Sequence, residues 1–151
     1  MKKVLCLVAL IMVCFLSACS SNLTSILSAH SSNLTSKESI VDLYTKNETL
    51  FINAATNKNF SDLEIINGVQ NVLVWDEYVD IQCGGSGFGS STNYFGIFFS
   101  ATDDLCAVDV AGPFDELVAD GSGYRYKETN GDNEYYVEPL GNHYFYYEAH
   151  F

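Results

Sequence analysis

The sequence contains few basic residues. Only 7 of its 151 residues are Lys or Arg, against 19 Asp or Glu, and the formal net charge at pH 7 is −12. Proteins bind nucleic acid largely through Lys and Arg contacts to phosphate groups, and anionic lipid headgroups repel an acidic surface. The composition therefore argues against a nucleic acid partner and against electrostatic binding to a membrane.

Motifs for metal, redox and nucleotide chemistry are missing as well. The 3 histidines form neither an HExxH motif nor a zinc-type cluster with cysteines, and no CxxC pair indicates redox chemistry. Residues 83–91 read CGGSGFGSS, but no lysine lies between Lys58 and Lys127, which excludes a P-loop. The same stretch misses the dinucleotide fingerprint and the G-x-S-x-G nucleophile elbow by one position each. We therefore expect no cofactor, no metal, no nucleotide partner and no catalytic centre.

No apolar run is long enough to span a membrane. Residues 4–15 are twelve consecutive apolar residues, whereas a spanning helix needs about 20. Lys2 and Lys3 precede this run and small residues follow it, which is typical of a secretory signal peptide.

The signal ends in Leu16-Ser17-Ala18-Cys19, which resembles the lipobox of bacterial lipoproteins. The resemblance implies a diacylglyceryl group on the Cys19 sulfur, cleavage before Cys19, and usually an N-acyl chain such as palmitate on the new terminus. Two acyl chains anchor a protein stably, because each buried CH₂ contributes roughly 0.8 kcal/mol. An ordinary signal peptide with an incidental cysteine is the alternative.

The lipid on Cys19 would hold the protein on the extracytoplasmic face of the cell membrane. Ser20 rather than Asp follows Cys19, which resembles the outer-membrane sorting pattern of bacteria with two membranes. Cleavage removes Lys2 and Lys3 and leaves 5 basic and 19 acidic residues, a mature charge of −14.

The chain divides into three segments. Residues 1–18 form the signal peptide, residues 19–36 a flexible tether rich in Ser, Asn and Thr, and residues 37–151 a single domain. The hexamer SSNLTS occurs twice in the tether, at 20–25 and 31–36, and the tether carries no charge. We expect nothing to pack on this segment; a weak helix with one apolar face is the alternative.

The domain sequence predicts one helix followed by strands. Thr35 and Glu38 match the S/T-x-x-E capping box, and apolar residues then recur at helical spacing, so we expect a helix from 36 to 58. The expected fold class is α+β: an N-terminal helix packed on an antiparallel sheet of about six strands, ending in a three-strand meander. Runs of β-branched and aromatic residues place the strands at 71–75, 78–83, 93–101, 105–110, 123–129, 133–138 and 143–151.

Asn130-Gly131 predicts a two-residue type I′ hairpin. This turn would place Lys127 opposite Glu134, a pair of opposite charges. It would also place Tyr126 opposite Tyr135, a pair of aromatic rings, and both kinds of pair stabilise a sheet.

The next hairpin is less determined by the sequence. A three-residue loop at 140–142 would place Val137 opposite Phe145 and Tyr135 opposite Tyr147. The core face of the last strand would then consist of Phe145, Tyr147, Ala149 and Phe151.

The cysteine content predicts one disulfide. Cys6 and Cys14 leave with the signal peptide and Cys19 carries lipid, so Cys83 and Cys106 remain in an exported protein. A bridge between them would close a loop of 24 residues and stabilise the fold by roughly 3.5 kcal/mol. Two buried thiols or a redox pair are the alternatives.

Two surfaces are candidates for binding. Tyr136, Tyr144 and Tyr146 would line the sheet face opposite the core, and exposed tyrosines often mark recognition of proteins or sugars. Packing of these tyrosines under another layer is the alternative. Gly85 and Gly87 lie in the expected turn between two strands, where glycine lets a ligand approach the backbone closely.

Together these features favour a lipid-anchored, non-enzymatic binding or accessory protein on the extracytoplasmic face, with a protein or glycan partner. The alternatives are an acidic inhibitor or immunity-type lipoprotein that blocks a basic partner, and a cell-wall glycan hydrolase that uses two carboxylates. The segments GGSGFGSSTNYFG, NGDNEYYVE and YFYYEA resemble small lipoproteins of gut-type Firmicutes. This resemblance implies no activity and no site residues.

Overall fold

The computed structural model describes residues 32–88, 91–105 and 117–151, all of which belong to one compact unit. The predicted lipobox with Cys19 and the second domain cysteine, Cys106, lie outside the described residues. Within the described ranges, no helix is both long enough and apolar enough to cross a membrane.

The predicted helix is confirmed as α2, Lys37–Asn57. Ser36 caps its N-terminus by accepting the Ser39 N–H at 3.3 Å, so the capping box predicted with Glu38 is wrong by one residue. The helix ends at Lys58, whose φ of 53° is left-handed and brings the chain back into the 3₁₀ helix η1, Phe60–Ile65.

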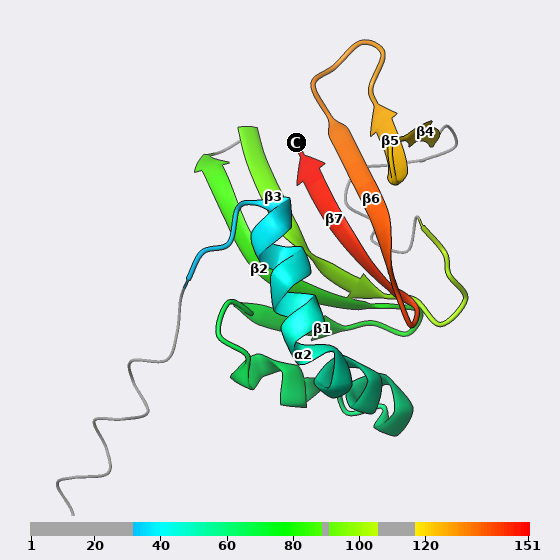
Figure 1. The fold of residues 1–151 in the computed structure, drawn as a ribbon. Helices are drawn as coiled ribbons and strands as arrows, with labels where there is room; N and C mark the ends of the chain where they lie inside the picture. Colours follow the sequence, from blue (N-terminus) through cyan, green and yellow to red (C-terminus); the bar gives the residue numbers. More distant parts are fainter. Residues whose placement is uncertain (1–31, 89–90, 106–116) are drawn as a thin grey trace, which may run out of the picture. The chain divides into compact units, whose positions relative to one another are not determined.

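Seven strands in the described residues form one antiparallel sheet in the order β1-β2-β3-β7-β6-β5-β4 (Figure 1). The α+β class is therefore confirmed. The sheet has seven strands where about six were expected, and its members differ from the predicted ranges: β4 was not predicted, whereas the predicted strand at 105–110 lies outside the described residues except for Leu105. The strands are β1 Asn71–Val74, β2 Val79–Phe88, β3 Ser91–Phe99, β4 Val118–Asp120, β5 Gly123–Lys127, β6 Glu134–Gly141 and β7 Tyr144–His150.

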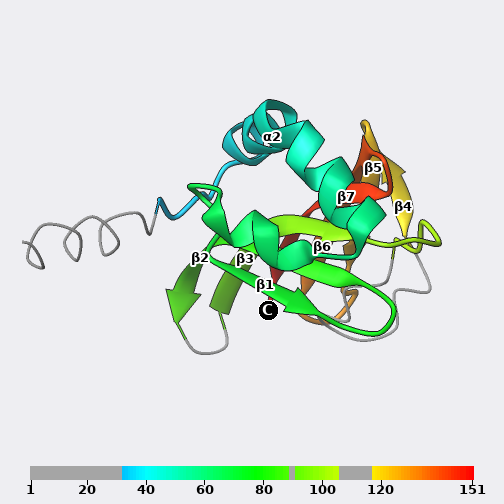
Figure 2. The same ribbon diagram turned by 90° about the horizontal axis from the view of Figure 1, so that it is seen from below.

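Both faces of the sheet carry a buried cluster. On one face α2 and η1 pack against the sheet, and Figure 2 shows both helices on the same side of β1, β2 and β3. Ile40 and Phe51 of α2 are fully buried in this cluster beside Ile81 and Ile97 of the sheet. The other face buries Phe98, Tyr135, Val137, Phe145, Tyr147 and Ala149.

The β5–β6 hairpin has the predicted register with a different turn. Lys127 pairs with Glu134 and Tyr126 with Tyr135, as expected. However, neither residue of the predicted Asn130-Gly131 turn has a positive φ, so the type I′ turn is wrong. The hairpin instead closes through a wider loop, at whose base the Glu128 N–H donates to the Asn133 carbonyl at 2.9 Å.

The β6–β7 hairpin closes through two residues instead of the expected three. Asn142 and His143 both have positive φ, 54° and 66°, as a type I′ turn requires. The predicted pairs are wrong, because Val137 pairs with Tyr147 and Tyr135 with Ala149. A bulge between Pro139 and Gly141 offsets the shorter loop, and the predicted core face is confirmed: Phe145, Tyr147 and Ala149 are buried, and Phe151 packs against them.

The end of the predicted tether packs on the domain. Leu34 joins the cluster beneath α2, and its N–H donates to the Cys83 carbonyl at 3.0 Å. The expectation that nothing packs on the tether is therefore wrong for residues 32–36, which belong to the fold.

Candidate functional site

The three tyrosines predicted to form an exposed surface are buried. Tyr136, Tyr144 and Tyr146 expose 6%, 0% and 0% of their surface and belong to the cluster beneath α2. The Tyr144 hydroxyl donates to the Phe51 carbonyl of the helix at 2.7 Å, and the Tyr146 hydroxyl donates to Glu148 at 2.8 Å. The prediction of an exposed tyrosine surface is wrong, because α2 covers this face.

Gly85 and Gly87 lie in a strand pair and not in an open turn. β2 continues to Phe88 and pairs there with the start of β3. The Gly85 N–H and carbonyl both bond to the Asn33 side chain, each at 2.9 Å. Gly87 has a φ of 112°, and a Cβ on it would lie 2.0 Å from the Ser91 carbonyl oxygen. The prediction that these glycines lie in a turn is therefore wrong, whereas contact with a ligand stays a prediction.

Cys83 is buried in the cluster beneath α2 and forms no disulfide with any of the described residues. Burial, together with the nearby Asp80 charge, raises its pKa to about 12, and a thiol that stays protonated is a poor nucleophile. Its predicted partner Cys106 lies outside the described residues, so the disulfide stays a prediction, as does lipidation of Cys19.

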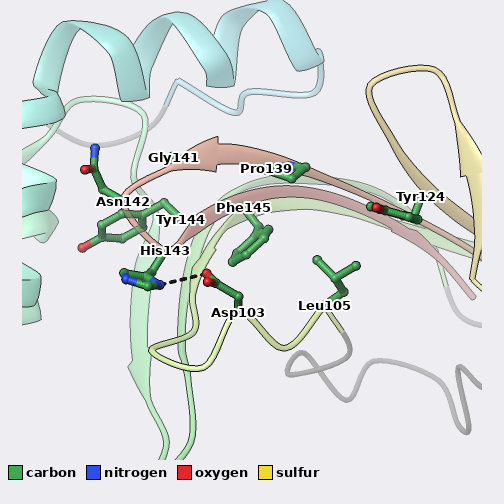
Figure 3. A pocket seen from close by; sticks show the side chains of 9 residues that line it. All are labelled: Asp103, Leu105, Tyr124, Pro139, Gly141, Asn142, His143, Tyr144 and Phe145. Carbon is green, nitrogen blue, oxygen red and sulfur yellow. Dashed lines mark hydrogen bonds and ion pairs between the residues drawn. The ribbon is translucent and has the colours of Figure 1, made fainter.

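One open pocket lies beside the β6–β7 turn (Figure 3) and has a volume of about 490 Å³. His143 and Asp103 form its polar end, with 2.8 Å between His143 Nδ1 and Asp103 Oδ1. Leu105, Tyr124 and Pro139 form its apolar side. A His–carboxylate pair can orient an imidazole as a general base, but the described residues that line this pocket include no Ser, Thr, Cys or Lys. Both side chains are also more than half exposed, where solvent weakens such a pair.

A second pocket, which we call the aromatic groove, lies between the β1–β2 turn and the end of α2. Its volume is about 410 Å³ and most of its lining is apolar, within the usual range of ligand sites. The backbone N–H of Trp75 donates to the backbone carbonyl of Tyr78 at 2.9 Å and closes the β1–β2 turn. The lining residues are 55, 58, 60, 74–79, 99 and 101.

Aromatic rings form the walls of the aromatic groove. The indole of Trp75 stacks on the ring of Tyr78, with centroids 6.1 Å apart and planes at 27°. Phe60 and Phe99 pack behind them with centroids 5.3 Å apart. Trp75 nevertheless remains 54% exposed, although it is the one tryptophan in the sequence. The structure thus holds a large aromatic ring in place and leaves much of it in solvent.

Charged side chains border the aromatic groove on two sides. Asp76 and Glu77 form the exposed tip of the β1–β2 turn, and Lys58 at the end of α2 lines the same groove. Carboxylates accept hydrogen bonds from hydroxyl and amine groups, and an ammonium group donates them. In the sequence Trp75 is the last residue of the predicted strand 71–75 and directly precedes Asp76 and Glu77, and that position was the available signal for this site.

The remaining polar groups of the described residues form no further cluster. In the described ranges, no buried side-chain nitrogen or oxygen lacks a hydrogen-bond partner, and no group of three His, Cys, Asp or Glu side chains could hold a metal ion. Comparisons with protein-family models, with curated proteins and with solved structures find no match for this chain.

Proposed function

We propose that the protein is a lipid-anchored binding protein on the extracytoplasmic face of the membrane, and that it binds glycan in the aromatic groove. The observation that carries this proposal is the exposed indole of Trp75, stacked on Tyr78 and flanked by Asp76 and Glu77. The less polar face of a sugar ring carries C–H groups that pack on an indole, while its hydroxyl groups need acceptors such as carboxylates.

The charge of the chain narrows the class of glycan. A mature charge of −14 disfavours anionic polymers, because like charges repel across an interface. The proposal therefore specifies a neutral or amino-sugar glycan, which the cell wall outside the membrane supplies.

Fluorescence of Trp75 tests the proposed glycan site directly, because no other tryptophan contributes to the signal. Titration with soluble oligosaccharides of N-acetylglucosamine should shift or quench the emission in a saturable way. The same titration with an anionic polysaccharide should leave it unchanged. An emission spectrum that no oligosaccharide alters at millimolar concentration would contradict glycan binding in the groove.

The lipid anchor is tested separately. Wild-type protein should fractionate with membranes, and Cys19→Ser should release it in soluble form. If the variant stays with the membranes, the anchor is wrong, whereas the groove proposal is unaffected.

A second candidate function is inhibition of a basic partner by the acidic surface. The acidic residues beside the groove and the mature charge of −14 favour it. Association through such a surface weakens steeply with salt. Capture of a partner that persists at high ionic strength would therefore argue against the inhibitor.

The hypothesis of a glycan hydrolase requires a carboxyl group of raised pKa that faces the substrate. Burial raises the pKa of Asp80, but this residue is 7% exposed and does not line the aromatic groove. The groove therefore supports binding better than hydrolysis. Turnover of peptidoglycan by the purified wild-type domain would overturn this preference.

A further inference from the structure

The last residues of the predicted tether occupy the outer edge of β2. β1 pairs with β2 only as far as Gln82. Beyond that point the Leu34 N–H donates to the Cys83 carbonyl at 3.0 Å. The Asn33 side chain then bonds to both backbone groups of Gly85: its Oδ1 accepts the N–H and its Nδ2 donates to the carbonyl, each at 2.9 Å. Residues 33–34 thus continue the hydrogen bonding of β2 where β1 ends.

Two glycines of the domain leave the space that residues 33–34 occupy. A Cβ on Gly84 would lie 2.0 Å from the Leu34 carbonyl oxygen, so only glycine allows the segment to approach. A Cβ on Gly68 would lie 2.8 Å from Leu34 Cδ1 and 2.7 Å from Leu43 Cδ1. The Leu34 side chain therefore sits in a recess made by a missing side chain and packs there on the cluster beneath α2. We call this recess and the adjoining edge at 83–85 the tether site.

The segment that fills the tether site has an identical copy upstream. Residues 31–36 read SSNLTS, and residues 20–25 read the same. The contacts to the tether site come from the Ser-Asn-Leu at 32–34. Residues 21–23 are the same three residues in the same order, so the upstream copy carries every side chain that the site recognises.

We propose that the tether site is a binding site for two segments of the same chain, and that residues 21–23 exchange with residues 32–34 in it. Asn33 is exposed and Leu34 is half-buried, so release of the segment removes one leucine from the cluster beneath α2 and leaves the strand pairing of the sheet intact. Docking of the upstream copy leaves the intervening residues as a loop, and the entropy of closing a loop grows only with the logarithm of its length. The downstream copy is the main occupant and the upstream copy the minor one.

Exchange of the two copies changes the length of free chain between Cys19 and the tether site. Thirteen residues separate Cys19 from Asn33, but only two separate it from Asn22. If Cys19 carries lipid, as proposed above, the domain has two heights above the membrane. The exchange itself requires no lipid, so its test uses the soluble mature chain with Cys19→Ser.

Hydrogen exchange of the Gly85 amide, measured by NMR, reports occupancy of the tether site, since this N–H donates to the docked asparagine. Asn33→Ala/Leu34→Ala should leave the amide partly protected, because the upstream copy replaces the lost segment. Adding Asn22→Ala/Leu23→Ala should speed exchange by at least about tenfold more. If the first variant already exchanges as fast as the combined one, the proposal is overturned.

Three controls make the outcome specific. Ile26→Ala/Leu27→Ala, added to the Asn33→Ala/Leu34→Ala variant, truncates apolar residues outside the repeat and should not speed exchange further; equal acceleration would overturn the proposal. Protection that grows with protein concentration would indicate docking between chains, which also overturns it. If the combined variant loses protection throughout β7 and so fails to fold, the milder pair Asn33→Ala and Asn22→Ala, which keeps both leucines, repeats the comparison.

Discussion

Tyr147 of β7 reaches across β3 to donate its hydroxyl proton to Asp80 of β2, at 2.8 Å. The strand between them carries Gly96, which pairs with both Gln82 and Tyr147. A Cβ at this position would lie 2.7 Å from the Tyr147 ring and 2.6 Å from the Ile81 carbonyl oxygen. The absence of a side chain in β3 is therefore what allows the buried hydrogen bond to form.

Gly96→Ala should destabilise the fold by about 1–3 kcal/mol, because the methyl group forces the Tyr147 ring or the β2 backbone to move. Urea denaturation measures the change in the free energy of unfolding. Gly131→Ala is the matched control, since its methyl group would meet only the end of the flexible Glu128 side chain. Equal stability of the two variants would contradict the crossing of β3 by Tyr147.

Asp80 should make stability depend on pH. Burial raises its pKa above 3.8, and hydrogen bonds from Tyr147 and Gln82 offset part of that rise. At pH values between the unfolded pKa of Asp80, near 3.8, and its raised folded pKa, the folded chain therefore binds more protons than the unfolded chain. The free energy of unfolding falls as pH rises through that window and stays lower above it, by at most about 1.4 kcal/mol per pH unit.

Asp80→Asn cannot titrate, so its stability relative to wild type should rise with pH above 3.8. Urea denaturation at several pH values gives the difference between the two proteins. Asp132→Asn removes the same charge at an exposed position and controls for the change in net charge. A difference between Asp80→Asn and wild type that is constant with pH would show that the Asp80 pKa is not raised.

Cys83 should resist thiol reagents in the folded protein, because its side chain is fully buried and its pKa is raised to about 12. Alkylation followed by intact-mass measurement tests this. In denaturant without reductant, adducts on both domain cysteines would exclude the predicted bridge to Cys106. Adducts that form only after reduction would establish it.

Trp75→Ala should weaken glycan binding strongly and stability little. Loss of an aromatic anchor at a binding site costs about 2 kcal/mol, or roughly 30-fold in affinity, whereas the exposed half of the indole contributes nothing to the core. Co-sedimentation with insoluble chitin, a neutral polymer of N-acetylglucosamine, measures the binding. Val118→Ala removes an exposed apolar side chain at the opposite edge of the sheet and should bind like wild type. A similar loss of affinity in both variants would show that the glycan does not bind in the aromatic groove.

The register of the β5–β6 hairpin was predictable although its turn was not. The pairs Lys127–Glu134 and Tyr126–Tyr135 are each favourable, and a slip of one residue would turn every side chain to the other face. Strand chemistry therefore determines the register, and loops of different length can satisfy it. The turn at Asn130-Gly131 depends on local backbone preference alone, which the wider loop overrides.

The burial of the tyrosines was not predictable from their alternation. Both faces of β7 carry large aromatic residues, so the alternating pattern does not distinguish a core face from an exposed one. A buried tyrosine also needs a partner for its hydroxyl group. For Tyr144 that partner is the Phe51 carbonyl, which lies far away in the sequence and is visible only in the structure.

The Asn33 side chain covers the edge of β2 at Gly85, where β1 no longer pairs with it. An exposed strand edge invites pairing with another chain, and a strand added to cover it would present a new edge of its own. A side-chain amide that bonds to both backbone groups of Gly85 satisfies the edge without extending it. The tether therefore acts as a terminator of β-sheet growth, and a chain that loses it gains an edge through which copies can aggregate.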